Sequence, residues 1–295
     1  MTRLKGFIQW LCLFKIIFSG RSVKTYGKEH IKYIYAKFKY EYLTELKELE
    51  LAENAIYTFS KSLNIENVGQ MTRFGPSGDG GYIGVDLFET PTVLSGGAGK
   101  NIDFEVFFAN RGSKVMVFDP TIQKLPKTHQ NIRHKKIGLE STNSNKFRNS
   151  INLSKSLKMV NEAFSRQNGL YLKVDIEGSE WDLLAASLTE TLNFDQIFIE
   201  FHDLYKLSDE NFRKKYLRVN NFLVKNFYFI SFTANNWATY INFGKGFTPL
   251  IYECTLLNKK HKSILAKKNK VSNKHLIYKN NANRPLIHNR PFFMD

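Results

Sequence analysis

The sequence is poor in cysteine and proline for its length. Its 295 residues include only two cysteines, Cys12 and Cys254, and seven prolines. Two cysteines cannot form a disulfide framework or a cysteine zinc site, and their scarcity favours a reducing compartment. Few prolines and 18 glycines exclude collagen-like or proline-rich architecture. A wholly disordered chain is excluded because 42% of the residues are hydrophobic, enough for a sizeable core.

The apolar segment near the start of the chain is too short to span a bilayer. It runs from Gly6 to Gly20 and is interrupted by Lys15, whereas a spanning helix needs roughly 20 apolar residues. A basic start resembles a signal peptide, but no A-x-A-like cleavage site follows. We therefore favour an amphipathic or interfacial helix. A helix that packs on the protein's own core remains the alternative.

Positive charge is concentrated at the two ends of the chain. The formal net charge is +16; residues 1–39 carry +8, residues 258–295 carry +9, and residues 40–257 carry −1. A nucleic-acid enzyme would more often carry basic charge around its working face. The basic ends could instead bind an anionic membrane surface or a polyanion, or only keep the protein in solution.

Residues 28–68 contain no glycine or proline, and their apolar side chains predict a long helix. Such a helix could form a homodimer through residues 28–63. It could also pack against the domain that follows, which is the more common outcome. Its heptad-like stripe consists of Tyr35, Tyr42, Leu49, Ile56 and Leu63, with Phe38, Ala52 and Phe59 three places on.

Short apolar runs alternate with helical segments between residues 70 and 257, which is typical of an α/β protein with a parallel sheet. The last two strands are expected to be antiparallel because no helix is predicted between them. We divide the chain into an N-terminal helical extension (1–69), an α/β domain (70–257) and a basic tail (258–295). Strands are predicted near 92–95, 114–118, 135–138, 170–174, 196–200, 227–233 and 250–257, and helices near 101–110, 152–166, 180–187 and 209–225.

A glycine-rich turn follows the first predicted strand of the domain. Gly97 and Gly99 supply two glycines of a dinucleotide fingerprint, but Ile102 occupies the third position, so the nicotinamide pattern fails. Asp119 ends the next strand, 22 residues after Gly97. An acidic residue there can accept hydrogen bonds from both ribose hydroxyls of a nucleoside. The pair predicts a nucleoside site, although each feature alone also suits a tight turn or a helix cap.

Carboxylates also end two later strands. Asp175 follows the strand near 170–174, and Glu200 and His202 end the strand near 196–200. Ligands of open α/β sheets bind beyond the carboxyl ends of the strands, so these three residues could form a catalytic or metal-binding cluster. The alternative is a capping role for Asp175 and a surface position for His202.

Several motifs together resemble one known family. They are Gly78-Asp79-Gly80-Gly81-Tyr82, the loop from Ser95 to Glu105, the string Lys173-Val174-Asp175-Ile176-Glu177-Gly178-Ser179-Glu180, Ile199-Glu200-Phe201-His202, and Asn235-Asn236. This set is similar to the FkbM-type branch of S-adenosylmethionine-dependent methyltransferases. The K-x-D-x-E-G-x-E string is its most specific part, and the resemblance covers about residues 70–257.

The resemblance implies a Rossmann-like seven-stranded methyltransferase sheet whose last strand is antiparallel and lies beside the fifth. It implies S-adenosylmethionine as cofactor, with Gly97 and Gly99 facing it and Asp119 holding its ribose. Asp79 and Gly80 would form a polar flap near the cofactor. Glu105, at the end of the glycine loop, is included among the cofactor-binding residues.

The expected reaction is O-methylation of a carbohydrate hydroxyl, on a surface glycan or a nucleotide-sugar precursor; this acceptor class rests on the resemblance alone. His202 is the candidate base because its pKa lies near working pH. Alternatively, Asp175 and Glu200 could bind Mg²⁺, which would lower the pKa of the acceptor hydroxyl. We expect a cytoplasmic protein whose basic ends permit attachment to the inner face of a membrane. A nucleic-acid methyltransferase and a non-catalytic, membrane-associated binding protein on this fold remain as alternatives.

Overall fold

The computed structural model describes residues 45–141, 149–165, 168–236, 240–243, 246–265, 277 and 280. The apolar run from Gly6 to Gly20, the first part of the predicted long helix and most of the basic tail lie outside these residues. None of the helices within these ranges is long and apolar enough to cross a membrane.

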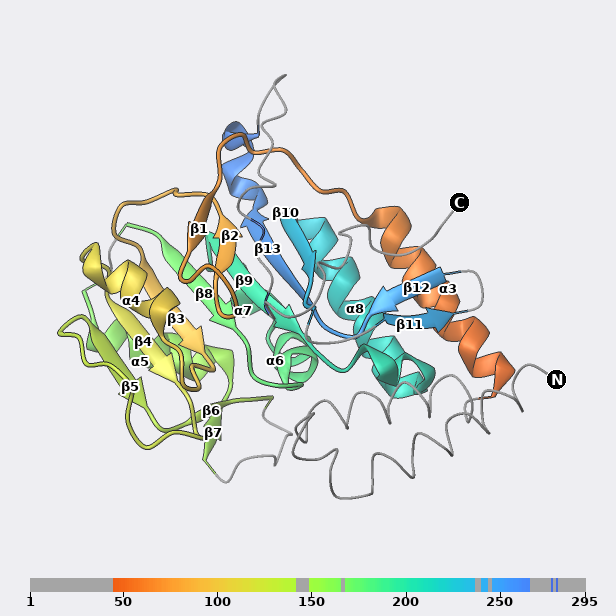
Figure 1. Ribbon diagram of the computed structural model, residues 1–295, viewed down its shortest axis with the longest axis horizontal. Helices are drawn as coiled ribbons and strands as arrows, with labels where there is room; N and C mark the ends of the chain where they lie inside the picture. Colours follow the sequence, from red (N-terminus) through yellow and green to blue (C-terminus); the bar gives the residue numbers. More distant parts are fainter. Residues whose placement is uncertain are drawn as a thin grey trace.

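The centre of the molecule is a mostly parallel seven-stranded sheet, consistent with a Rossmann-like α/β fold (Figure 1). β13 alone runs in the direction opposite to the other six strands, and it lies between β9 and β10. The expected antiparallel pairing of the last two strands is therefore confirmed. From one edge to the other the strands are β10 (Phe227–Ala234), β13 (Tyr252–Asn258), β9 (Gln196–Phe201), β8 (Leu170–Val174), β3 (Thr92–Gly96), β4 (Val115–Phe118) and β5 (Ile132–Lys135).

One strand lies a few residues away from its predicted position. The strand expected near 135–138 is β5, at Ile132–Lys135. Its residues alternate between half-buried and exposed positions, as expected for an edge strand, so it lacks the continuous apolar run of the central strands. The apolar residues after it leave the sheet, and Gly138–Leu139 (β6) pairs instead with Ser150–Ile151 (β7). A hairpin, β11 (Tyr240–Phe243) and β12 (Gly246–Pro249), lies between the last two predicted strands, in a segment where no strand or helix was predicted.

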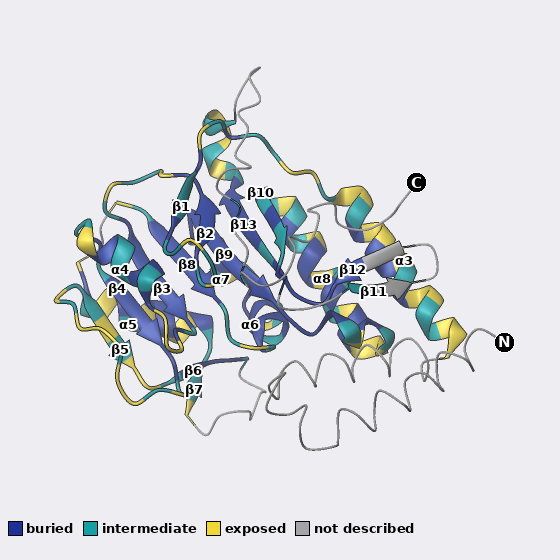
Figure 2. Cartoon of the chain, in the orientation of Figure 1, coloured by how far each residue is buried: buried dark blue, intermediate teal, exposed yellow. Residues whose placement is uncertain are grey.

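The two faces of the sheet bury different helices because successive strand residues point to opposite sides. In β3, Leu94 joins the core beneath the helices of one face, and Val93 joins the core of the other. The central strands β3, β8 and β9 are buried along their whole length, as Figure 2 shows in dark blue. The first face carries α5 (Leu153–Ala163), α6 (Glu180–Ala186) and α8 (Glu210–Asn226), and the second carries α4 (Asp103–Asn110) and the hairpin of β1 (Thr72–Phe74) and β2 (Tyr82–Gly84).

The described part of the predicted long helix is α3 (Leu46–Ser62), which packs against α8 (Figure 1). Phe59 meets Tyr216 of α8 edge-on, with ring centroids 5.8 Å apart. Arg213 of α8 also forms an ion pair of 3.0 Å with Glu48. In this part of the chain the apolar stripe is therefore covered by the protein's own domain. The homodimer through residues 28–63 stays a prediction, and residues 28–44 lie outside the described ranges.

Short helices complete the connections of the fold. α7 (Leu188–Thr191) precedes β9, η2 (Leu204–Ser208) follows it, and η3 (Lys259–Ile264) follows β13. Because β3, β4, β8 and β9 are parallel, their carboxyl ends open at one edge of the sheet. The motifs identified in the sequence meet at that edge.

Candidate functional site

The glycine turn after β3 contains two glycines with different tasks. Gly97 has φ +77°, and a Cβ atom there would overlap the carbonyl oxygen of Asp175. Glycine is thus required for the close approach between the ends of β3 and β8. Gly99 has φ +55°, but no atom lies within 4 Å of the position its Cβ would occupy. That open space belongs to a cavity.

Asp119, at the end of β4, organises this glycine turn. Its Oδ2 accepts hydrogen bonds from the backbone N–H groups of Ala98 (2.9 Å) and Gly99 (2.8 Å). Its Oδ1 accepts from the backbone and the hydroxyl of Thr121, at 2.8 and 2.6 Å. Burial opposes ionisation of Asp119, but these hydrogen bonds outweigh it and lower the pKa of the carboxyl group.

A cavity of about 480 Å³ opens between the glycine turn and the ends of β4 and β8. Its size falls within the range of roughly 300–1,000 Å³ that is common for small-molecule sites. Five of the predicted cofactor residues line it, as does Asp175. These lining residues are Asp79, Gly80, Gly97, Gly99 and Asp119.

Glu105 is absent from the cavity wall, which differs from the sequence-based expectation. The apolar face of α4 turns toward the sheet, and Glu105 on that face is fully buried. Its Oε1 accepts a hydrogen bond of 2.5 Å from the hydroxyl of Ser95 in β3. Glu105 therefore lies behind the glycine turn and supports it without facing the cavity.

Lys173 is a site residue to which the sequence analysis gave no role. Its buried ammonium group donates to the carbonyl oxygen of Gly97 and lies 3.5 Å from Asp175 Oδ2 and 4.0 Å from Glu105 Oε1. Burial by itself would lower the pKa of Lys173, but the two carboxylates outweigh it and raise the pKa. A lysine inside an otherwise apolar strand was the signal in the sequence, because such a charge is not buried without partners.

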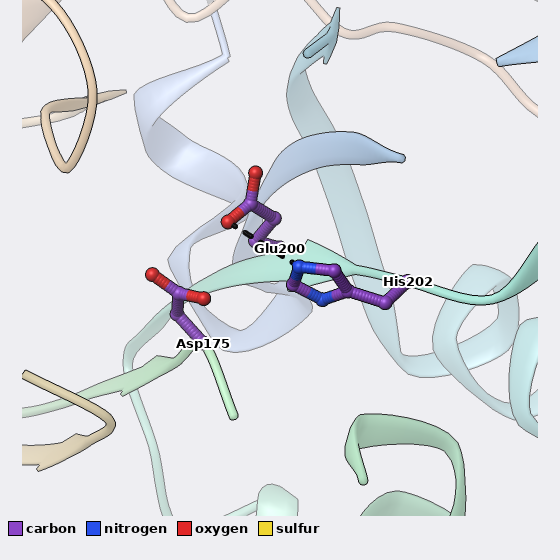
Figure 3. Close-up of side chains that lie close together, drawn as sticks. All are labelled: Asp175, Glu200 and His202. Carbon is purple, nitrogen blue, oxygen red and sulfur yellow. Dashed lines mark ion pairs between the residues drawn. The ribbon is translucent and has the colours of Figure 1, made fainter. Parts of the chain in front are cut away.

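The structure brings Asp175, Glu200 and His202 together, as the sequence predicted. Their side chains point toward one another from the ends of β8 and β9 (Figure 3). One potential ligand atom from each residue lies within 4.8 Å of the other two. Glu200 and His202 are buried, and Asp175 is half-buried where it meets the cavity.

The two carboxyl groups of this cluster have pKa values shifted in opposite directions. Burial opposes ionisation of Asp175, but Lys173 and His202 outweigh it and lower the pKa. Burial and the neighbouring charge of Asp175 both raise the pKa of Glu200 well above its usual value. Asp175, at the cavity wall, therefore ionises more readily than Glu200.

Glu253 adds a further carboxyl group to the same edge. It lies directly opposite Glu200 in the register of β13 and β9. Burial raises its pKa to about 7, and hydrogen bonding from Asn280 only partly offsets that effect. Asn235, at the end of β10, donates to Glu200 Oε1. The sequence analysis assigned no role to Glu253, because only the pairing of the antiparallel strand places it beside Glu200.

His202 is surrounded by carboxyl groups on both sides of its ring. Nδ1 lies 3.1 Å from Glu180 Oε1, and Nε2 lies 3.4 Å from Glu177 Oε2 and 3.8 Å from Glu200 Oε2. Burial alone would lower the pKa of His202, but Glu180 and the other carboxyl groups outweigh it and raise the pKa well above its usual value. A protonated imidazole cannot accept a proton, so this environment argues against His202 as the general base.

Glu180 is fully buried at the start of α6, and its position is set by backbone donors. Its Oε1 accepts hydrogen bonds from the N–H groups of Ile176 (3.0 Å) and Gly178 (3.1 Å). A carboxylate fixed in this way can hold the proton of His202 on Nδ1 and leave Nε2 to face Glu200. Metal-binding histidines commonly have this arrangement.

The donor set of the cluster fits a divalent cation in part. Two carboxylates are suitable ligands for Mg²⁺ or Mn²⁺, whereas an imidazole nitrogen favours transition ions over Mg²⁺. The set of Asp175, Glu200 and His202 thus suits Mn²⁺ at least as well as the expected Mg²⁺.

The glycine-rich motif before β2 forms a flap, defined here as residues 76–81. The guanidinium group of Arg73 donates to the carbonyl oxygens of Pro76 (2.6 Å) and Gly78 (2.5 Å). Asn101 Nδ2, from the glycine-turn side, donates to the carbonyl oxygen of Asp79 at 3.3 Å. The flap is therefore an ordered wall of the cavity.

Comparison of the sequence with protein-family models and with curated proteins finds no match. The geometry of the site therefore carries the argument about function.

Proposed function

We propose that this chain is an S-adenosylmethionine-dependent O-methyltransferase that acts on a carbohydrate hydroxyl. One observation carries the proposal: the cavity bounded by the glycine turn and Asp119 shares Asp175 with the carboxylate and imidazole cluster. A cavity of a size common for small-molecule sites and a group able to accept a proton thus adjoin at the carboxyl edge of the sheet. The resemblance of the sequence motifs to FkbM-type methyltransferases selects methyl transfer among the reactions that such an edge can support.

The cavity supports the choice of cofactor. Asp119 reaches it from the end of β4, where a carboxylate can accept from a ribose diol. Both oxygens of Asp119 already accept two hydrogen bonds each. The hydroxyl of Thr121 can rotate, so its bond is the one that a ribose hydroxyl would replace. The bonds to the backbone of the turn would remain and keep the site ordered.

Methyl transfer needs positioning and one proton acceptor. The acceptor oxygen forms a bond to the methyl carbon as the carbon–sulfur bond breaks, which converts the sulfonium into a neutral thioether. The hydroxyl proton must leave the acceptor oxygen, and Asp175 is the ionised carboxylate at the cavity wall. We therefore assign Asp175 as the proton acceptor. Lys173 and His202 hold it ionised through their positive charge.

A divalent cation could occupy the cluster once His202 has lost its proton, because only a neutral imidazole binds a metal ion. Asp175, Glu200 and His202 would hold it, and Glu180 would orient His202. When bound, such an ion supplies a positive charge that lowers the pKa of a nearby hydroxyl. Either way, the role of Asp175 is to bring negative charge to the reacting hydroxyl.

The charge of the site favours a neutral acceptor over a phosphate-bearing one at the reacting end. Asp175, Glu200 and Glu253 meet here, and Asp79 lies on the adjoining flap. A phosphate group close to Asp175, the carboxyl group here whose pKa is lowered, would be repelled. A sugar hydroxyl carries no such charge, and this difference supports a carbohydrate over a nucleic acid.

Calorimetric titration with S-adenosylhomocysteine, S-adenosylmethionine and NAD tests the proposal. The proposal is supported if S-adenosylhomocysteine and S-adenosylmethionine bind and NAD does not. It is contradicted if neither S-adenosylhomocysteine nor S-adenosylmethionine binds. Asp119→Ala should weaken binding of S-adenosylhomocysteine by roughly tenfold or more, because a hydrogen bond to a charged group contributes about 1.5–3 kcal/mol. Asp86→Ala removes a carboxylate that pairs with Arg111 away from the cavity, and it should leave binding unchanged.

A second variant separates turnover from binding. Asp175→Asn should retain affinity for S-adenosylhomocysteine within about twofold. It should lower methyl transfer to a sugar acceptor by roughly 10²-fold or more, the usual contribution of a general base. Full activity of Asp175→Asn would contradict the assigned role. Attachment of the basic ends to an anionic membrane stays a prediction, because most residues of those ends lie outside the described ranges. A cytoplasmic location also stays a prediction.

A further inference from the structure

A residue from the C-terminal segment joins two parts of the site. The side-chain nitrogen of Asn280 donates to Glu253 Oε1 at 2.6 Å and to Asp79 Oδ1 at 3.3 Å. An amide nitrogen carries two hydrogens, so it can serve both carboxyl groups at once. Glu253 belongs to β13, and Asp79 belongs to the flap that lines the cavity.

Asp79 connects the flap to two neighbours, Asn101 and Asn280. Asn101 holds its backbone carbonyl from the glycine-turn side, whereas Asn280 holds its carboxyl group next to Glu253. Two carboxyl groups that approach one another repel when both are ionised. A neutral amide that donates to both reduces that repulsion, so the flap can lie beside β13.

The segment that carries Asn280 has an apolar anchor nearby. Ile277, three residues earlier, packs against a buried apolar cluster that includes residues of β2, β10 and β13. That cluster adjoins the flap, since β2 begins directly after it. The members of the cluster are Val68, Met71, Ile83, Val85, Ile230 and Leu257.

We propose that Asn280 is a positioning residue, which holds the flap of residues 76–81 against β13 and so keeps Asp79 and Gly80 in the cavity wall. The identity of the ligand in that cavity rests on the proposed function, but the fastening of the flap does not. On this basis the C-terminal segment contributes to the binding site from a point far away in the sequence.

Hydrogen exchange of the flap amides and titration with S-adenosylhomocysteine test this role in the full chain. In Asn280→Ala, flap amides should exchange about fivefold faster and the Kd should rise about fivefold, because a lost hydrogen bond corresponds to roughly 1 kcal/mol. Asn280→Asp should have a larger effect on both, because it places a third carboxyl group beside Glu253 and Asp79. Asn280→Gln retains the amide and should recover part of the lost affinity.

A matched control is available elsewhere on the surface. Asn64 Nδ2 donates to Glu66 Oε1 at 2.7 Å, an exposed bond of the same chemical kind. Asn64→Ala should change neither flap exchange nor ligand affinity. Melting temperatures of all variants should lie close together, so that the measured differences report the site and not the stability of the whole fold.

The outcomes distinguish this inference from the proposed function. If the unaltered protein does not bind S-adenosylhomocysteine, the proposed function fails, and flap exchange in the ligand-free protein still decides whether Asn280 fastens the flap. Unchanged flap exchange in both Asn280→Ala and Asn280→Asp overturns the inference. Faster flap exchange with unchanged affinity also overturns it, because the flap would then be fastened without positioning the ligand site.

Discussion

Buried carboxyl groups at the two ends of strand β9 have pKa values shifted in opposite directions. At the amino end, Asp195 Oδ1 lies 2.7 Å from both Lys260 Nζ and His261 Nε2, and Oδ2 accepts from Leu170 N at 2.8 Å. Burial opposes ionisation of Asp195, but these partners outweigh it and lower the pKa. At the carboxyl end, burial and neighbouring carboxyl groups raise the pKa of Glu200 well above its usual value.

The amino end of β9 contributes to stability, whereas the carboxyl end belongs to the candidate site. Each partner of Asp195 favours the folded, ionised state, so the amino end contributes to stability. The carboxyl end brings Asp175, Glu200 and Glu253 together, which costs stability, and such arrangements are common at functional sites. Backbone strain follows the same division. Within the described ranges, the non-glycine residues with positive φ are Glu177 (+54°) and Asp203 (+64°), both at the carboxyl end.

The most severe test of this division is Gly97→Ala at the carboxyl end. The new Cβ atom would overlap the carbonyl oxygen of Asp175, so the ends of β3 and β8 must separate. We expect a loss of about 3 kcal/mol or more in the free energy of unfolding, measured by urea denaturation. The control is Gly99→Ala, which has open space around it and should cost about 1 kcal/mol through its positive φ alone. Equal losses in the two variants would contradict the close approach at Gly97.

At the amino end, Asp195→Asn should lower the free energy of unfolding by about 2 kcal/mol, because it leaves Lys260 and His261 without their shared anion. Urea denaturation at pH 7 measures the change.

The matched variant at the carboxyl end is Glu200→Gln. It removes a carboxyl group from among others of like charge and keeps an oxygen for Asn235, so stability should stay within about 1 kcal/mol or increase. Methyl transfer should nevertheless fall. A loss of stability as large as that of Asp195→Asn would remove the distinction between the two ends.

The pH dependence of stability should also differ between the two ends. Glu253 has a pKa raised from 4.5 to about 7, so its contribution is fully present below pH 4.5 and is lost as the pH rises toward 7. Asp195 has a pKa lowered from 3.8, so its contribution is present above that pH and is lost on acidification. We expect Glu253→Gln to remove part of the decline in stability between pH 4.5 and 7. Asp195→Asn should reduce only the loss of stability on acidification. Chemical denaturation over a series of pH values measures both effects.

The smallest effect is expected for Lys260→Ala. This side chain is about half exposed, and exposed ion pairs contribute about 0.5 kcal/mol. His261 would still pair with Asp195. Thermal unfolding at low and high salt measures the change, which should shrink as salt rises. A loss of stability as large as that of Asp195→Asn would mean that Lys260 alone accounts for the stabilising effect of Asp195.

The parts of the fold that sequence reasoning predicted are those with local signals. Apolar runs that end in glycine or a carboxylate located β3, β4, β8 and β9, and hence Asp119 and Asp175. β5 was misplaced because an edge strand has no continuous apolar run. Glu105 was expected in the cavity because its neighbours in sequence are there, but the apolar face of α4 turns it toward the sheet.

The rest of the site depends on pairing between distant segments, which no local pattern reveals. Glu253 meets Glu200 through the register of an antiparallel strand. Glu180 and Glu177 were visible in the sequence motif, but their contacts with His202 arise from the turn between β8 and α6. Asn280 lies 201 residues from Asp79 in the sequence, and nothing in its neighbours indicates the contact.

The reversed direction of β13 has a consequence for the order in which the protein is completed during synthesis. β13 runs from Tyr252 at the carboxyl edge to Asn258, whose backbone N–H bonds to Asp195 at the amino edge. Asn280, 22 residues after Asn258, contacts Glu253 and the flap at the carboxyl edge. Because a ribosome delivers residues from the N-terminus onward, all seven strands are available for pairing before this last contact is made. The contact between Asn280 and the flap can therefore form only after the residues of all seven strands have been synthesised.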